Sequence, residues 1–487
     1  AIRITIMQIK SVIRILGLLL MLFSLAIIPP VIVSLIYHDN ETWSFFYAGI
    51  LIFVSGLLLW LPAAQAKTDL KLRDGFIIVV LFWFVLSSFA SLPMILSESL
   101  NITITNAIFE SVSGLTTTGA TILNEIDSLP ESILFYRQYL QWLGGLGIIV
   151  LAVAVLPMLG VGGMQLYRAE VAGPIKNKIT PRITETAKWL WVVYLSMTVL
   201  CGLSYYLAGM TIFDSICHSF STIAIGGFST HNESFGFYNN QWIELVAIIF
   251  MIAAGLNFSL HYLAFKNKSL EPYKNDNESY SFIFITIFIS ILTIFYLYQI
   301  NSEMSFREII KNVFYAVSIS TTTGFTNSDY LNYVGFLPIL LILFSFIGGC
   351  AGSTAGGMKV IRVILLLKQG YRELVRLVHP NSKIKVKVGN TAINERTLET
   401  IWGFFAIYVF VFLTVMLLLM FSGLDFLTSF SAVAATINNL GPGQGEVLNN
   451  YSNLTDINKW ILSFSMIVGR LEIFTLLVIF TPDFWKK

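Results

Sequence analysis

The sequence is poor in the residues that catalysis, metal binding and disulfide formation use. It contains 3 cysteines and 5 histidines among 487 residues. Cys201, Cys217 and Cys350 lie in or near apolar segments and have no metal-ligand spacing, so we interpret them as packing residues. The sequence also contains no HExxH motif and no candidate Ser-His-Asp arrangement. These absences argue against an enzyme.

Charged residues are scarce as well. Only 12% of the residues are charged, whereas a soluble domain carries about 25%. The 30 basic and 28 acidic residues nearly balance, so the charge indicates no nucleic-acid partner. Hydrophobic residues make up 56% of the chain, and the mean hydropathy is +0.75. This composition predicts a membrane protein.

Ten apolar runs are long enough to cross a membrane, for which a helix needs about 20 apolar residues. The first two are residues 12–37 and 44–63. Because the first is too long for a signal sequence and the second follows at once, we interpret both as spans. The other eight form four pairs. They are residues 75–97 with 137–159, 187–208 with 241–265, 280–300 with 334–358, and 400–422 with 458–481.

Each pair encloses a short run with helical character and then a glycine stretch. The runs are residues 106–115, 213–223, 307–320 and 425–437. The stretches read TTTGAT at 116–121, IGGFST at 225–230, TTGFTN at 322–327 and NLGPGQ at 439–444. Their glycines recur about every hundred residues, which indicates a repeated membrane unit. The runs are too short to cross a core about 30 Å thick, so we expect them to be re-entrant pore helices.

The sequence therefore predicts an all-α polytopic membrane protein. Two N-terminal spans precede four parallel repeats of span, pore helix and span around one central pore, an architecture like that of K+ channels. We expect residues 1–70 to hold the two N-terminal helices. The four pore repeats are expected at residues 71–165, 166–270, 271–390 and 391–487.

The basic residues predict the orientation in the membrane. With both termini cytoplasmic, most basic residues lie inside, and only Arg137, Arg307, Lys311 and Lys459 lie outside. All four glycine stretches then approach the external face, which makes the repeats parallel rather than inverted. The most basic segment, residues 359–396, is expected in the cytoplasm, where it faces anionic lipid headgroups or docks a cytosolic partner.

The four glycine stretches predict a selectivity filter. Non-helical backbone at membrane depth is stable only where it is buried in protein or lines a cavity. Glycine permits the left-handed dihedrals that turn successive carbonyls the same way, and the C-terminal ends of the pore helices favour a cation. A ring of such carbonyls selects a dehydrated cation. The predicted filter residues are Thr117, Thr118, Gly119, Ile225, Gly226, Gly227, Thr322, Thr323, Gly324, Asn439, Leu440 and Gly441.

Two further features predict a gate beneath the filter. Residues 348–357 read GGCAGSTAGG in the middle of a span, which indicates either close helix packing or, as we favour, a break that forms a loop. Arg470 lies in an apolar run, so it is either paired with an acid or presents its charge to the ion path; Glu472, two residues on, does not face it on a helix. The predicted gate residues are Gly348, Gly349, Gly352, Ser353, Thr354, Gly356, Gly357 and Arg470.

These stretches resemble the Trk/Ktr/HKT superfamily of potassium transporters, most closely the bacterial TrkH type. The resemblance covers essentially the whole chain, and the two additional N-terminal spans favour TrkH over the shorter KtrB type. The matching stretches are TTTGAT at 116–121, STIAIGGFST at 221–230, STTTGF at 320–325, GGCAGSTAGGMK at 348–359, INNLGPG at 437–443 and GRLEIFTLL at 469–477.

The resemblance implies K+ uptake across the bacterial inner membrane by a homodimer with one pore per protomer. It implies a cytosolic ring of TrkA-type nucleotide-binding (RCK) subunits that controls opening, with the nucleotide, NAD or ATP, on that partner only. The glycine-rich loop is then the gate, Arg470 is the family's arginine below the filter, and Gly119, in place of serine, fits the K+-selective type.

One alternative within transport is a symporter that couples K+ to H+ or Na+. No intramembrane acidic pair stands out as a coupling site. Glu110, Asp214 and Asp425 lie near the pore helices, where they are expected to be helix caps or external surface charges.

Overall fold

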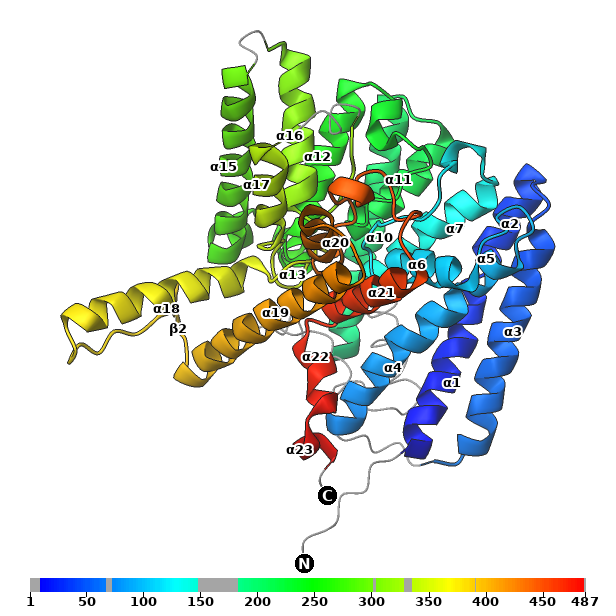
Figure 1. The fold of residues 1–487 in the computed structure, drawn as a ribbon, viewed down its shortest axis with the longest axis horizontal. Helices are drawn as coiled ribbons and strands as arrows, with labels where there is room; N and C mark the ends of the chain where they lie inside the picture. The colour runs from blue at the N-terminus through cyan, green and yellow to red at the C-terminus, as the bar shows by residue number, and fades with distance from the viewer. Residues whose placement is uncertain are drawn as a thin grey trace, which may run out of the picture.

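The structure, a computed structural model, describes residues 9–66, 72–147, 183–300, 304–327, 335–389 and 391–485. Nearly all regular structure in this part of the chain is helical (Figure 1). Six helices are long and apolar enough to cross a membrane, and two further helix pairs pass the same test but bend sharply between their members. The prediction of an all-α multi-pass membrane protein is confirmed. The end of the predicted span 137–159 lies outside the described residues, and the predicted repeat boundaries stay predictions.

The two N-terminal spans pack against each other through glycine. A Cβ atom on Gly17 would lie 2.6 Å from the carbonyl oxygen of Gly56, and one on Gly56 would lie 2.8 Å from that of Gly17. Small residues allow this close backbone approach between membrane helices. The pair lies at one edge of the molecule beside α4 (Figure 1). The elements are α1 (Ile9–Leu25), which α2 (Ile28–Tyr37) continues, and α3 (Thr42–Trp60) with η1 (Leu61–Ala63).

Four units follow, each with an outer helix, a pore helix and a second helix. The outer helices are α4 (Leu72–Ala90) with α5 (Leu92–Leu96), α10 (Ile183–Ala208), α15 (Asn277–Ile300) and α19 (Glu395–Phe421). The pore helices are α6 (Ile104–Leu115), α11 (Ile212–Ala224), α16 (Phe306–Ser320) and α20 (Phe426–Ile437). The second helices are α7 (Glu131–Trp142), α12 (Gln241–Gly255), α17 (Phe336–Ser345) and α21 (Asp456–Arg470).

All four pore helices begin with the same kind of cap. The residue before each helix is a Ser, Thr or Asp whose side chain accepts a hydrogen bond from a backbone N–H of the first turn. Such a cap satisfies a donor that the helix itself leaves unpaired. The capping residues are Thr103, Thr211, Ser305 and Asp425. The expectation that Asp425 is a cap is therefore confirmed.

The second helix of each unit is not continuous. α7 runs into a π-helix, η3 (Leu143–Gly147), and fourteen residues separate the end of α17 from the start of α18 (Val360–Val378). α12 bends by 95° into α13 (Phe258–Asn267), and α21 bends by 103° into α22 (Phe474–Leu477) and η7 (Val478–Phe480).

The predicted spans 241–265 and 458–481 correspond to these two helix pairs, and the sequence did not indicate that either is bent. At the first bend, the side chain of Asn257 caps α13 by accepting from the N–H of Ser259. At the second, Glu472 and Ile473 take left-handed φ values of 52° and 55°, which no helix can continue. The hydropathy averaged over a window stays high across both bends, so a hydropathy profile cannot reveal them.

α18 leaves the bundle and runs beside α19, to which the short antiparallel hairpin of β1 (Lys387–Val388) and β2 (Thr391–Ala392) connects it (Figure 1). α1 begins and α23 (Pro482–Trp485) ends at the same edge of the molecule in this view. The remaining short elements are η2 (Ile126–Ser128), η4 (Ser234–Phe237), α14 (Glu271–Lys274) and η6 (Gly445–Val447).

We expect Gly56→Ala to lower the melting temperature of the purified protein by a few degrees. The added methyl group would lie 2.8 Å from the carbonyl oxygen of Gly17, and such overpacking costs about 1–3 kcal/mol. Gly49→Ala is the control on the same helix, because its Cβ would meet only the side chain of Ile27, at 3.6 Å. Equal melting temperatures for the two variants would show that the glycine crossing is not needed.

Candidate functional site

The four glycine stretches adopt the same backbone conformation. In each, two residues in the left-handed region are separated by one residue. The first of these is Thr117, Ile225, Thr322 or Asn439, with φ between 52° and 65°. The second is Gly119, Gly227, Gly324 or Gly441, with φ between 81° and 97°. A left-handed conformation is costly for residues other than glycine, so its recurrence at four matched positions indicates a shared requirement.

Each stretch is joined to its pore helix by the same hydrogen bond. The residue before each glycine donates its backbone N–H to a carbonyl oxygen five residues earlier in the helix. These bonds join Thr118 to Ser113 (2.9 Å), Gly226 to Ser221 (2.8 Å), Thr323 to Ser318 (2.8 Å) and Leu440 to Ala435 (2.7 Å). This is the bond of a Schellman-type helix end, in which the left-handed residue turns the chain back across the last turn. Each strand is therefore held directly beyond the C-terminus of its pore helix.

The glycines show that the four strands close into a ring. A Cβ atom built on each glycine would collide with the carbonyl oxygen that precedes the glycine of the next unit. The clashes are Gly119 with Gly226 at 2.1 Å, Gly227 with Thr323 at 2.2 Å, Gly324 with Leu440 at 2.0 Å and Gly441 with Thr118 at 2.5 Å. The last contact returns from the fourth unit to the first. No residue with a side chain fits this packing, which explains why glycine stands at all four positions.

The ring presents backbone oxygens that accept no hydrogen bond from the part of the chain that the structure describes. Among the described residues, no donor reaches the carbonyl oxygens of Thr117, Ile225, Thr322 or Asn439. Buried carbonyl groups in native proteins are almost always paired with protein, water or an ion. These oxygens, beside four helix C-termini with partial negative charge, form a site that suits a cation.

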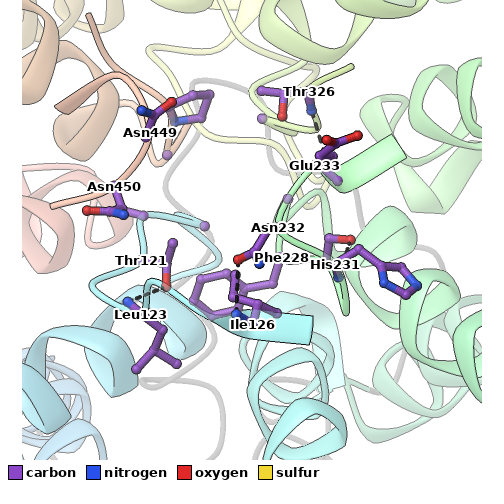
Figure 2. A pocket seen from close by; sticks show the side chains of 18 of the residues that line it. Thr121, Leu123, Ile126, Phe228, His231, Asn232, Glu233, Thr326, Asn449 and Asn450 are labelled. Atoms are coloured by element: carbon purple, nitrogen blue, oxygen red, sulfur yellow. Dashed lines mark hydrogen bonds between the residues drawn. The ribbon is translucent and has the colours of Figure 1, made fainter. Parts of the chain in front are cut away.

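A cavity of about 370 Å³ opens on one side of the ring. Residues that follow the glycines in all four units line it, among them Phe228, Thr326 and Asn450 (Figure 2). The loops around it are tied to one another across units. Asn450 donates to Asn124 at 2.7 Å, Asn232 donates to Asp127 at 2.7 Å, and Phe235 donates its N–H to the carbonyl oxygen of Thr326 at 3.0 Å.

The other side of the ring is covered by the loop of residues 348–357, which lies between α17 and α18. Its hydrogen bonds reach the residues that precede the glycines in the second, third and fourth units. Thr354 Oγ1 donates to the carbonyl of Ile223 (2.8 Å), the N–H of Gly356 to Thr322 Oγ1 (2.7 Å) and the N–H of Gly357 to the carbonyl of Asn438 (3.2 Å). The ring therefore lies between the cavity and the loop.

Arg470, the last residue of α21, completes this cover on the side of the first unit. Its guanidinium donates to Thr117 Oγ1 at 3.2 Å and to the carbonyl oxygen of Thr354 in the loop at 3.3 Å. It also donates to the carbonyl oxygens of Gly144 and Gly145 in the π-helix, at 2.5 and 2.8 Å. The arginine therefore links the glycine strand of the first unit, the interrupted second helix of that unit and the loop.

Glu472, the neighbour that the sequence left as a partner for Arg470, is bound by Arg362 of α18. Arg362 also lies 4.3 Å from the centre of the Phe404 ring on α19. Close by, the ammonium group of Lys359 donates to the carbonyl oxygen of Ala355 in the loop. Two basic residues at the start of α18 thus hold the loop and the bend after α21.

Comparisons with known proteins agree with this geometry. The family model of TrkH, described as a cation transport protein, matches residues 42–487. The chain belongs to the TrkH family. It is 52% identical over 485 residues to the Trk system potassium uptake protein TrkH of Vibrio parahaemolyticus, covering 99% of this chain and 100% of the relative. The corresponding values for TrkG of Escherichia coli K12 are 40% identity over 481 residues and 99% of both chains.

A solved structure of this family also matches. The crystal structure of the potassium transporter TrkH from Vibrio parahaemolyticus superimposes with a TM-score of 0.90 at 50% sequence identity, covering 99% of this chain and 100% of that one. The suspected resemblance to the TrkH type is confirmed.

The structure of this TrkH-family chain brings together the residues that the sequence singled out. All twelve predicted filter residues lie in the four strands of the ring, and the predicted gate residues lie in or against the loop. Their roles as filter and gate stay predictions.

Two acidic residues are placed differently from the sequence-based expectation. Glu110 is fully buried and Asp214 is 7% exposed, and neither caps its pore helix. Arg137, predicted on the external side, is buried as well, at 1% exposure. Arg137 Nε binds Glu110 Oε1 at 2.8 Å, and the other carboxylate oxygen accepts the N–H of Ile122 at 2.9 Å. The pair joins α6 to α7. Glu110 and Arg137 carry opposite charges on consecutive helices, and this pattern in the sequence could have suggested the ion pair.

Asp214 and His231 form a second charged group beside the cavity. His231 Nδ1 lies 2.8 Å from Asp127 Oδ1, and Nε2 lies 3.5 Å from Asp214 Oδ1. The imidazole stacks on Phe237 with 3.6 Å between ring centres. Burial lowers the pKa of His231, but the interactions with the negatively charged Asp214 and Asp127 outweigh it and raise the pKa above 6.5. This loop histidine was not identified from the sequence.

We expect His231→Gln to lower the melting temperature most in acidic buffer. A raised pKa means that the folded state gains stability from the charged imidazole, which is fully present below pH 6.5 and is lost as the pH rises through the folded-state pKa. The difference in melting temperature between wild type and variant should therefore shrink from acidic to alkaline pH. His379→Gln, at an exposed position, is the control. A difference that is constant with pH would contradict the ion pair.

Proposed function

We propose that this chain is a potassium uptake protein that conducts K+ through the ring of glycine strands. The observation that carries the proposal is the closed ring itself. Beside each helix C-terminus, its four strands present a carbonyl oxygen that no donor among the described residues reaches. The names of the relatives, Trk system potassium uptake proteins, support K+ as the ion and support a transporter rather than an enzyme.

In the proposed filter, a K+ ion enters from the cavity and exchanges its water shell for backbone carbonyl oxygens. Because the strands that carry these oxygens are held by the packing of each glycine against the neighbouring strand, the ring resists shrinking around a smaller ion. The cation is cargo, and the chain supplies the oxygens, their spacing and the negative potential of the pore-helix ends.

In the proposed gate, the loop of residues 348–357 and Arg470 block the exit from the filter. Support comes from the hydrogen bonds that attach the loop to three units and the arginine to the first. An ion that leaves the filter meets both a steric obstacle and a positive charge. Opening then requires the loop to leave the pore-helix ends, and Lys359 and Arg362 connect that movement to α18.

We further propose the assembly and location that the family resemblance implied. The chain forms a homodimer in the bacterial inner membrane, with both termini in the cytoplasm and a TrkA-type nucleotide-binding ring below. α18 supports the docking proposal, because this basic helix leaves the bundle and retains exposed apolar residues, including Leu367, Tyr371 and Leu374.

Coupled symport of K+ with H+ or Na+ is the second candidate. Glu110 does not favour it, because this buried carboxylate is occupied by Arg137 and by the N–H of Ile122. Asp425 does not favour it either, because its carboxylate caps α20 by accepting two backbone N–H groups.

The test is Rb+ flux into liposomes that contain the purified chain, with and without a proton gradient. We expect flux that the gradient does not change; dependence on the gradient would favour symport. In the same liposomes, Gly119→Ser should raise the Na+/K+ permeability ratio measured from reversal potentials, since its Cβ would lie 2.1 Å from the carbonyl oxygen of Gly226. An unchanged ratio would count against Gly119 as a filter residue.

We expect Arg470→Ala to increase flux and to leave K+ selectivity largely unchanged. The guanidinium stays charged at any accessible pH. At an effective dielectric near 20, two unit charges about 6 Å apart repel by roughly 3 kcal/mol, which corresponds to about a hundredfold in rate. Arg470→Lys should keep most of the barrier. Reduced flux together with a less stable protein would show instead that the arginine is structural.

A further inference from the structure

One glutamine of the first unit makes two hydrogen bonds to the strand of the second unit. Gln141 lies on α7 and is fully buried. Its Nε2 donates to the carbonyl oxygen of Gly226 at 2.6 Å, and its Oε1 accepts the N–H of Phe228 at 3.1 Å. One side-chain amide thus binds the backbone on both sides of Gly227.

Two neighbours of Gln141 extend this attachment along the same strand. Gln138 donates to the carbonyl oxygen of Phe228 at 3.2 Å, and Arg137 donates to that of Ser229 at 3.3 Å. Residues four apart share one face of a helix, so Arg137 and Gln141 face the strand together. The second strand is consequently bound along its length by the first unit.

Position 226 needs a glycine because of the Gln141 side chain, and not because of its own backbone conformation. Gly226 does not have a positive φ, unlike the glycine that follows it. A Cβ atom on Gly226 would lie 2.4 Å from both Cδ and Oε1 of Gln141. The other units have Thr118, Thr323 and Leu440 at this position, so the position itself accepts a side chain.

The hydrogen bond from Gln141 to Gly226 also makes the second strand of the ring different from the other three. The carbonyl oxygen that Gln141 holds is the one that packs against Gly119. Among the described residues, no protein donor reaches the equivalent carbonyl oxygens of Thr118, Thr323 and Leu440. Gln141 therefore acts where the strands of the first and second units meet.

We propose that Gln141 is a positioning residue that sets the spacing between the first and second filter strands and thereby the discrimination between K+ and Na+. The inference rests on the proposed function. K+ selectivity requires carbonyl oxygens that do not close around a smaller ion, and this depends on what holds the strands apart. A strand held at two backbone groups on either side of Gly227 resists that movement.

The experiment compares reversal potentials of liposomes that contain wild type or Gln141→Met. Methionine has nearly the same shape and removes both hydrogen bonds. We expect the Na+/K+ permeability ratio to rise about fivefold or more, since the net contribution of each of the two lost hydrogen bonds corresponds to about fivefold. Rb+ flux should persist. The matched control is Trp142→Phe, which removes a bond of 3.0 Å from the same helix to Thr198 on α10, away from the filter. Its ratio should equal that of wild type.

Gly226→Ala tests the same contact from the strand side, and it decides the question if Gln141→Met does not fold. The methyl group collides with the amide of Gln141, so the ratio should rise in the single variant. In a Gln141→Ala background, which already lacks the amide, adding Gly226→Ala should change the ratio little further. Purely additive effects of the two substitutions would overturn the proposal.

The proposal would also be overturned if Gln141→Met kept the Na+/K+ permeability ratio of wild type, or if Trp142→Phe raised that ratio as much as Gln141→Met does. Both results leave the proposed function intact provided that wild type itself is selective for K+. Wild-type liposomes without selective Rb+ or K+ flux would instead refute the proposed function.

Discussion

The central constraint on this protein is that four stretches of non-helical backbone must lie inside a membrane. Such backbone is stable only where its polar groups face protein, water or an ion. Here each strand is held at one end by its pore helix and laterally by the next strand, whose carbonyl oxygen occupies the space where a glycine Cβ would be. The pore-helix caps, the left-handed residues and the four glycines all follow from this arrangement.

The interruption of the second helices depends on the same ring. Because these helices break, Gly144 and Gly469 approach pore-helix carbonyls so closely that a Cβ on them would lie 1.8 and 2.2 Å away. The breaks also bring Arg470 and the loop of residues 348–357 under the ring. Buried ion pairs such as Glu110 with Arg137 connect the surrounding helices, and breaking one by removing a partner costs about 3–5 kcal/mol.

Much of the fold could be predicted, since membrane spans and caps are local properties. Ser305 and Asp425 before short apolar runs, and glycine at matched intervals, are visible without coordinates. The bends after Gly255 and Arg470 could not be predicted, because hydropathy averages over a window and the apolar character continues through both. The burial of Arg137 was missed because the count of basic residues treats every charge between spans as exposed.

The sequence by itself determined the membrane class, the four repeated units and the positions at which only glycine is acceptable, because hydropathy and backbone preference reside in single residues and short windows. Only the tertiary structure decided the order of the strands around the ring, the partner of Glu472 and the reason for Gly226. These are contacts between residues 85 to 110 positions apart or in different units. Spatial neighbours of this kind are chosen by packing, and no local pattern of residues records them.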